Sequence, residues 1–503
     1  MKKNRAWQSF FLTLMVISGL MALFYLPRIC WGDVELRRVN ILADIQRRDE
    51  GGHILAEIVA DSIDGYVREK IDSTAIVVQP LAYTDSVPEG MVAIEDFADV
   101  EGVHREMDYF YAALDEAHER PVRIAYFGDS YIEGDIITMD LRARLQQKYG
   151  GHGVGFVEIA CVSSDFRRSV ITKREKWTAF HANEKGKGFR QDTQGLAGSY
   201  FIPGDSATFE IRGTKKYYPG LLDSAEVATV FFTPGETLNI HCSLNGQESQ
   251  LLFSQSVSQE PEIYGDLAEA IDSDSIAAYD TIVRPILPEQ DDVPKVLAQA
   301  VEGRIGRFGM VVEGGDDSKF YGVAFDASCG VSLDNFSLRG SGGQHIGKIP
   351  LEMLREFSRV RPYDLIVLHF GLNVANENQK NYASYASRMK KVIKHLKTAF
   401  PHTSILVVSV ADRNSKGPDG QMHTMEGVRE LLSYERKMAS DSKVAFWNLY
   451  QAMGGDGSIA KMVEKEHANL DYTHINFAGG RHLADLLFEV LMQGKENYDN
   501  RAR

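Results

Sequence analysis

The strongest constraint on the fold is an alternation of strand-like and helix-like segments that occurs twice along the chain. Short apolar runs such as VRIAYF (122–127) and DLIVLHF (364–370) are typical of buried strands. They alternate with amphipathic segments such as YASYASRMKKVIKHLKTAF (382–400), whose apolar positions recur at helical spacing. Strands alternating with helices predict an α/β fold in which a parallel sheet is covered on both faces.

A different pattern separates the two α/β stretches. Between about Cys161 and Gly330, short alternating runs such as SATFEIRG (206–213) are divided by turn residues. This pattern is typical of an all-β sandwich or jelly roll. We therefore expect one α/β domain, at 93–160 and 331–495, that is interrupted by a β domain at 161–330.

The N-terminus predicts a membrane anchor. A basic flank within the first five positions precedes a stretch from Ala6 to Pro27 that has no charged residue and can cross a bilayer as one helix. The flank predicts that the N-terminus stays in the cytoplasm and that the rest is exported. No small-x-small cleavage site follows, which favours an uncleaved anchor over a removed signal peptide. We expect a cytoplasmic end and anchor at 1–27, with 7–26 in the inner membrane, and a connector at 28–92.

Composition argues against a nucleic-acid partner, a metal and a cofactor. The 503 residues carry a net charge of −15 and contain no run rich in Lys and Arg. Because a nucleic-acid partner needs a basic face, none is expected. The sequence has no Cys or His cluster with zinc spacing, so no metal and no cofactor are predicted.

Four cysteines are present, namely Cys30, Cys161, Cys242 and Cys329. Disulfides are permitted if the body of the protein is exported. Cys242 and Cys329 lie in strand-like runs of the predicted β domain. They could pair with each other, or both could be buried free thiols, and the sequence does not choose between these alternatives.

Ser130 stands in FGDSYIEGD (127–135), after a buried strand and before a helix. Ligands gather beyond the carboxyl ends of the strands in an open parallel sheet. A serine at a helix start also finds free backbone N–H groups that can stabilise an oxyanion. Taken alone, however, the stretch is better explained as a helix N-cap, because Asp and Ser are favoured there.

Three further stretches carry polar residues at places where chemistry is possible. The loop DNFSLRGSGGQHIG (334–347) could bring backbone N–H groups close to a ligand, and Asn373 in LHFGLN could donate its amide to a negative oxygen. Asp471 and His474, in DYTH, could set a carboxylate beside an imidazole. Singly, a turn, an Asx-turn and an exposed Asp–His pair explain these stretches better. Together with Ser130 they supply what acyl transfer requires.

The same stretches resemble the sequence blocks of the SGNH (GDSL-type) hydrolases. The blocks are found here as GDS with Ser130, LRGSGG with Gly340, GLN with Asn373, and DYTH with Asp471 and His474. The chain departs from the usual G-x-N-D, which is GLNV here, at a position outside the four residues that name the family. The resemblance covers roughly 93–160 and 331–495. It implies a flavodoxin-like three-layer sandwich with a parallel sheet.

The spacing of the first two blocks adds to the resemblance. Gly340 lies 210 residues after Ser130, far more than the family needs. This arrangement is similar to that of peptidoglycan O-acetylesterases that carry a carbohydrate-binding-type β domain at this point. The resemblance implies a membrane-anchored serine esterase that removes O-acyl groups, with acetyl expected, from a cell-envelope or extracellular glycan. Its catalytic domain would lie in the periplasm or another extracytoplasmic space.

The resemblance also implies a role for each residue. His474 takes the proton of Ser130, Asp471 holds the imidazole, and the backbone N–H groups of Ser130 and Gly340 and the amide of Asn373 meet the oxyanion. Two alternatives stay open: the same triad could pass the acyl group to a sugar hydroxyl, or it could be idle in a glycan-binding protein.

Residues of the predicted insert bear on the last alternative. The insert contains a single tryptophan, Trp177, so further sugar platforms would have to come from residues such as Tyr217 and Tyr218. These tyrosines fit ordinary strand positions better. Arg413, in VADRN after a strand, could line the site or cap a helix.

Overall fold

The computed structural model describes residues 30–31, 34–35, 82–97, 105–160, 166–183, 188–256 and 296–502. The chain divides into two compact units, Met1–Val78 and Gln79–Arg503. In the first unit, the described residues form the short antiparallel pair β1 (Cys30–Trp31) and β2 (Val34–Glu35). The predicted anchor at 7–26 lies outside the described residues. Within the described ranges, no helix combines the length and apolar composition that a membrane crossing requires.

The second unit is built around a seven-stranded sheet. In spatial order its strands are β15 (Gly330–Ser337), β5 (Pro121–Gly128), β16 (Leu365–His369), β17 (Ser404–Val408), β20 (Ala445–Trp447), β4 (Ile94–Phe97) and β3 (Ala82–Thr84). The first five strands are parallel. In chain order they read 2-1-3-4-5, the flavodoxin-like order.

The sequence pattern predicts a purely parallel sheet, and this prediction is wrong for two strands. β4 pairs antiparallel with β20, and β3 pairs antiparallel with β4. These two short strands come from the chain before β5, within and just after the predicted connector, and they extend the β20 edge. Only β3 lies at the edge of the sheet, since β4 is paired with both β20 and β3. The two strands have three and four residues, too few to form an apolar run.

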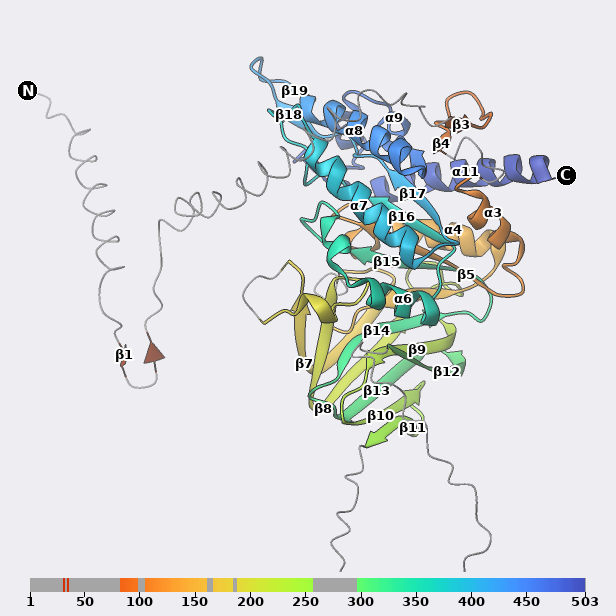
Figure 1. The fold of residues 1–503 in the computed structure, drawn as a ribbon, viewed down its shortest axis with the longest axis vertical. Helices are drawn as coiled ribbons and strands as arrows, with labels where there is room; N and C mark the ends of the chain where they lie inside the picture. The colour runs from red at the N-terminus through yellow and green to blue at the C-terminus, as the bar shows by residue number, and fades with distance from the viewer. Residues whose placement is uncertain are drawn as a thin grey trace, which may run out of the picture. The chain divides into compact units, whose positions relative to one another are not determined.

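Helices cover both faces of this sheet. One group packs together as α3 (Asp108–Asp115), α4 (Thr138–Tyr149) and α11 (Phe477–Ala502). The other group is α6 (Leu351–Val360), α7 (Ala383–Ala399) and α8 (Glu426–Ser442), which lies on the near side in Figure 1. Two short helices, α9 (Leu449–Ala452) and α10 (Ser458–Glu464), precede α11. The result is the expected three-layer α/β arrangement.

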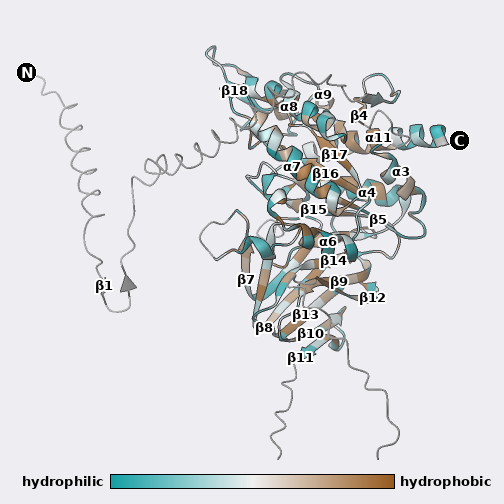
Figure 2. Ribbon diagram, in the orientation of Figure 1, coloured by the Kyte–Doolittle hydropathy of each residue, from teal (hydrophilic) through white to brown (hydrophobic). Residues whose placement is uncertain are grey.

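Burial explains why the central strands are mostly apolar. Every residue of β16 and of β17 is buried. A strand covered by helices on both faces has no polar side, so it reads as a continuous apolar run. In Figure 2 these strands are accordingly mostly brown, whereas β7 (Val170–His181) alternates between brown and teal.

A β-rich insert interrupts the α/β part, and nine strands within its described residues form a second sheet. They are β6 (Gly153–Val157), β7, β8 (Ser199–Gly213), β9 (Ala225–Thr233), β10 (Thr237–Leu244), β11 (Gln250–Ser256), β12 (Leu297–Ile305), β13 (Arg307–Gly314) and β14 (Lys319–Asp326). Because β6 pairs with β14, the sheet begins before residue 161, the first residue of the predicted insert. Figure 1 shows this sheet below the parallel one.

The structure shows whether two cysteines of the insert form a disulfide. Cys242 and Cys329 are both free, the first fully buried on β10 and the second half-buried. Of the two alternatives left open by the sequence, the structure has the free thiols. Cys161 lies outside the described residues.

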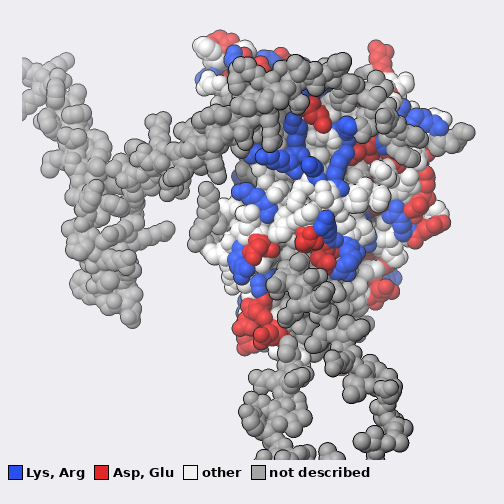
Figure 3. Space-filling model, viewed as in Figure 1, with Lys and Arg blue, Asp and Glu red and all other residues white. Residues whose placement is uncertain are grey.

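Positive charge is concentrated on α7. The helix carries Arg388, Lys390, Lys391, Lys394 and Lys397 and contains no Asp or Glu. Lys390 and Lys397 form ion pairs with residues outside the helix, at 3.2 Å each. Figure 3 shows Lys and Arg gathered over α7 on the face drawn. The prediction that the chain contains no run rich in Lys and Arg is therefore wrong at 388–397, and a local basic surface exists despite the negative net charge.

Candidate active site

The topology brings three strand ends together. Gly128, the last residue of β5, is in register with Ser337 of β15 on one side and with His369 of β16 on the other. The chain order reverses between β5 and β16, which is the topological switch point where ligands bind in open α/β sheets. Ser130 and Asn373 follow these strand ends directly, so both emerge at this point.

Ser130 lies on a tight turn after β5, not at the start of α4. Two hydrogen bonds to Asp129 close the turn. The N–H of Tyr131 donates to Asp129 Oδ1 at 3.1 Å, and the N–H of Ile132 donates to the carbonyl of Asp129 at 3.3 Å. A 3-10 turn, η1 (Glu133–Asp135), then leads to α4 at Thr138. The N-cap explanation of Ser130 is therefore wrong. Ser130 itself is 9% exposed.

Gly128 has a packing reason to be glycine. A Cβ there would lie 2.9 Å from Ile132 Cγ1 and 3.0 Å from the carbonyl oxygen of His369. Such approaches are closer than a side chain tolerates. The turn that presents Ser130 can therefore sit close against β16 only because Gly128 has no side chain.

Asp471 and His474 form the expected pair. His474 Nδ1 and Asp471 Oδ2 are 2.8 Å apart, and Asp471 Oδ1 accepts the backbone N–H groups of Thr473 and His474, each at 3.0 Å. Burial would raise the pKa of Asp471, but these hydrogen bonds from His474 and Thr473 hold it below its usual value. The carboxylate stays ionised, and the Nε2 atom of His474 is left for another partner.

The turn of Ser130 is linked to the loop of His474. The neighbour of Ser130, Tyr131, donates its hydroxyl to the carbonyl of Thr473 at 3.1 Å. Asp129, the other neighbour, lies close enough to His474 for the imidazole charge to lower the pKa of Asp129. Among the described residues, no hydrogen bond joins Ser130 Oγ to His474.

The glycine-rich loop and the Asn373 loop also meet. Leu338 donates its N–H to the carbonyl of Gly128 at 2.9 Å, which starts the glycine-rich loop beside the serine turn. Asn373 Nδ2 donates to the carbonyl of Ser341 at 3.2 Å. Gly340 is exposed, has φ +77°, and has open space where a Cβ would stand. The predicted oxyanion residues thus lie on adjoining loops.

Asp129 is a buried acid that the sequence analysis did not single out. Burial raises its pKa to about 7, although the Tyr131 N–H, the His474 charge and the nearby amides of Asn373 and Leu372 lower it. It is 1% exposed. Its place in the GDS block was the only sequence signal, because burial arises only when the loops after β5 and β16 fold together.

Arg413 holds the Asn373 loop and does not cap a helix. Its Nη1 donates to the carbonyl of Leu372 at 3.2 Å and lies 3.5 Å from the carbonyl of Ala375. These carbonyls flank Asn373 on both sides. The sequence leaves two roles open for Arg413, and the structure gives it this third one.

The aromatic residues considered as sugar platforms make contacts within the protein. Trp177 Nε1 donates to the carbonyl of Thr208 at 2.8 Å. The Tyr218 hydroxyl donates to Asp140, and the Arg168 guanidinium lies 5.7 Å from the centre of the Tyr217 ring. The strand positions expected for Tyr217 and Tyr218 are wrong, because both lie on the turn between β8 and β9. Within the described part of the chain, no group of His, Cys, Asp and Glu is arranged to hold a metal ion.

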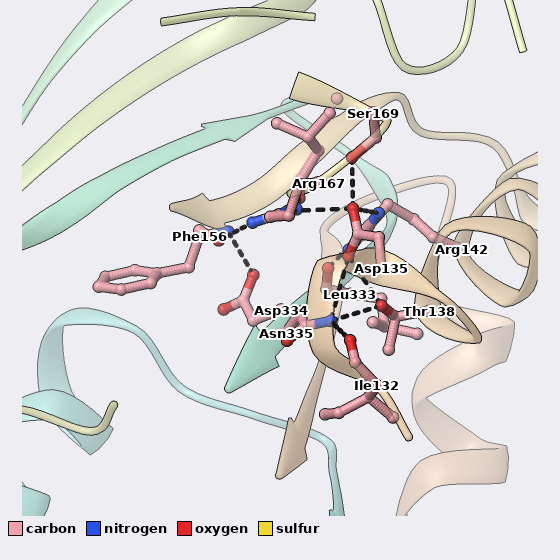
Figure 4. Close-up of polar contacts among 12 residues, drawn as sticks. Ile132, Asp135, Thr138, Arg142, Phe156, Arg167, Ser169, Leu333, Asp334 and Asn335 are labelled. Carbon is pink, nitrogen blue, oxygen red and sulfur yellow. Dashed lines mark hydrogen bonds and ion pairs between the residues drawn. The ribbon is translucent and has the colours of Figure 1, made fainter. Parts of the chain in front are cut away.

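A buried polar network surrounds Asp135, five residues after Ser130 in the chain (Figure 4). Asp135, in the left-handed region at φ +66°, is fully buried and accepts from Arg142 at 3.3 Å and from Arg167 at 3.0 Å. Burial would raise its pKa, but the two guanidinium groups hold it well below its usual value. Asn335 on β15 donates to the carbonyl of Ile132 at 2.6 Å and to Asp135 at 3.2 Å. Thr138 and Ser169 donate to the same carboxylate.

No family model matches the sequence, and no curated protein matches it. Among solved structures, a peptidoglycan O-acetylesterase aligns with a TM-score of 0.59 at 17% identity, covering 80% of this chain and 99% of that one. A psychrotrophic esterase from Pseudoalteromonas sp. aligns with a TM-score of 0.25 at 13% identity, over 33% of this chain and 78% of that one. The first alignment spans both the α/β part and the β-rich insert. The chain therefore shares the fold of that structure.

Proposed function

We propose that the protein is a serine esterase that removes O-acyl groups, with O-acetyl expected, from a cell-envelope or extracellular glycan. The observation that carries the proposal is the meeting of four loops at the switch point of the sheet. These loops hold Ser130, Gly340, Asn373 and the Asp471–His474 pair. The fold shared with a peptidoglycan O-acetylesterase supports the choice of substrate class.

The proposed reaction has two steps. His474 Nε2 takes the proton of Ser130 as Ser130 Oγ attacks the ester carbonyl, and Asp471 stabilises the imidazolium that forms. Collapse of the tetrahedral intermediate expels the sugar oxygen, which receives the proton from His474. Water, deprotonated by the same imidazole, then releases the acyl group as the free acid and restores Ser130.

The oxyanion of each intermediate is met by three donors. They are the backbone N–H groups of Ser130 and Gly340 and the Nδ2 amide of Asn373. Such a donor lowers the barrier by about 3 kcal/mol, because it is aimed in advance at the charge that develops. Gly340 is exposed to solvent, as a residue that contacts a substrate needs to be.

The test is acetate release from a panel of acetylated peptidoglycan and polysaccharides. We expect one substrate class to release acetate and Ser130→Ala to abolish release while its melting temperature is unchanged. Full activity in Ser130→Ala would show that Ser130 is not the nucleophile and would contradict the proposed function. If acetate disappears from the donor and returns as a new sugar ester, the enzyme is an acyltransferase instead.

Membrane anchoring belongs to the same proposal. We expect residues 7–26 to hold the protein in the inner membrane, with unit Gln79–Arg503 on the extracytoplasmic side. The full chain should sediment with membranes, and external protease should digest its body in spheroplasts. Recovery of the full chain in the soluble cytoplasmic fraction would contradict the anchor without affecting the esterase test.

A further inference from the structure

The glycine-rich loop after β15 contains a serine–histidine pair outside the predicted triad. Ser341 Oγ and His345 Nδ1 are 2.8 Å apart, and the N–H of Gly343 donates to the same Ser341 Oγ at 3.0 Å. Ser341 also donates its own N–H to the carbonyl of Leu338 at 3.1 Å. The hydroxyl and the backbone of Ser341 are therefore both held in place.

The carbonyl of Ser341 contacts the predicted oxyanion residue. It accepts one N–H of Asn373 Nδ2 at 3.2 Å. A primary amide has two N–H groups in one plane, so holding one of them sets the direction of the other. The amide of Asn373 also lies near the buried carboxyl group of Asp129, whose pKa it lowers. We expect an oxyanion to use the N–H that Ser341 does not hold.

His345 is itself held between two parts of the molecule. Its ring lies edge-on to Phe370, which follows β16, at 6.3 Å between ring centres. On another side it meets Gly198 at the start of β8 in the insert, where a Cβ would stand 3.3 Å from the ring. Burial, with the charge of Lys348, lowers the pKa of His345 to about 4. The ring is therefore neutral at neutral pH.

We propose that Ser341 and His345 are positioning residues that orient the Asn373 amide toward the oxyanion. The proposal rests on the proposed function, because it explains how the Asn373 amide is aligned in the proposed esterase site. His345 fixes the Ser341 side chain, Ser341 fixes its own carbonyl, and that carbonyl fixes Asn373. Neither residue touches the reacting atoms. Since His345 packs against Gly198, the insert supports this arrangement.

The experiment is a double-mutant cycle on the full chain with p-nitrophenyl acetate as substrate. Asn373→Ala is expected to lower kcat by about 100-fold, as loss of an oxyanion donor does. Ser341→Ala is expected to lower kcat by about tenfold with KM within twofold, because the donor is kept but misaligned. In the Asn373→Ala background, Ser341→Ala is expected to have no further effect.

Replacements of His345 provide a matched comparison. His345→Asn places a polar atom where Nδ1 stands, whereas His345→Gln places it where Nε2 stands and His345→Leu removes it. We expect kcat to be kept within threefold in His345→Asn and to fall about tenfold in the other two. His402→Leu, an exposed histidine before β17, is the control and should leave kcat unchanged.

The outcomes separate this inference from the proposed function. If the wild type and Ser130→Ala are equally inactive on every ester, the proposed function fails, and hydrogen exchange of the loop 338–346 still reports on the pair. Unchanged exchange there in Ser341→Ala and His345→Leu would then overturn the inference. If the wild type is active, additive effects of Ser341→Ala and Asn373→Ala, or equal loss in His345→Asn and His345→Leu, would overturn it.

Discussion

At the residue scale, the contact between Asp471 and His474 decides which ring nitrogen is free. Asp471 Oδ2 takes the Nδ1 side at 2.8 Å. Asp471→Asn would offer an N–H to Nδ1 and favour the wrong tautomer. We expect it to lower kcat on p-nitrophenyl acetate by about 10³–10⁴-fold with little change in KM.

The chain offers a matched control for this substitution. Asp419 and His423 form a similar exposed pair, with Nε2 and Oδ2 2.8 Å apart. Asp419→Asn should leave kcat unchanged. Equal losses in both variants would mean that Asp471 acts only on the general stability of the loops.

Asp129 predicts a pH dependence of stability. Burial raises its pKa from 3.8 to about 7 in the folded protein. The folded state therefore binds this proton more tightly than the unfolded state does. The stability that the protonated group contributes is fully present below about pH 4 and is lost as the pH rises through about 7.

Asp129→Asn keeps a neutral group at this position at every pH. We expect the variant to melt at a higher temperature than the wild type at pH 8 and at nearly the same temperature at pH 4. Paired thermal unfolding curves between these values measure the difference. A gap between the two proteins that does not change with pH would rule out titration of Asp129 as its cause.

At the element scale, the segment between Ser130 and α4 depends on an arginine that comes from the start of the insert. Arg167 donates its Nε to Asp135 at 3.0 Å and its two terminal nitrogens to backbone carbonyls of β6 at 2.8 and 2.9 Å. It thus joins the serine turn to the first strand of the second sheet. The sequence showed Asp135 and Arg167 as two ordinary charges 32 positions apart.

Removing Arg167 is expected to be costly. Arg167→Met leaves a buried carboxylate with half of its compensating charge, and we expect it to lower the free energy of unfolding by about 3 kcal/mol in urea. Asp135→Asn in the same chain should recover part of that loss. Arg190→Met, which breaks an exposed ion pair with Asp192, should leave the midpoint unchanged. Similar midpoints for both Arg→Met variants would contradict the role of the network.

At the scale of the whole molecule, the insert has an apolar core of its own and also contributes residues to the core of the α/β part. Phe357 of α6 packs against Tyr321 of β14, with ring centres 5.3 Å apart, and against Phe231 of β9, at 6.3 Å. Phe231 in turn contacts Phe156 of β6 at 5.8 Å. The insert is therefore packed into the fold and is not a module on a linker.

Phe357→Ala tests this shared core. We expect it to lower stability by about 3–5 kcal/mol, because a buried aromatic leaves a cavity. Hydrogen exchange with increasing urea should show peptides of both sheets opening at one common midpoint, in the wild type and in the variant. Separate midpoints for the two sheets, with only one of them shifted, would show two independent domains.

The sequence by itself determined the fold class, the interruption by a β-rich segment, and the helices and strands with strong periodicity. It also predicted the pairing of Asp471 with His474, because residues three apart on a turn meet locally. The strands that it missed include β3, β4, β7, β12 and β15, and it failed to rule out the N-cap explanation of Ser130. Those elements depend on neighbours distant in the chain.

Only the tertiary structure decided how the site is held together. The register of β15, β5 and β16 sets three loops side by side, which gives Asn373 the carbonyl of Ser341 and buries Asp129. The same packing of distant loops also brings partners to Arg167, Arg413 and His345. A sequence pattern records local spacing and periodicity, whereas burial and charge pairing arise when distant segments exclude water from one another.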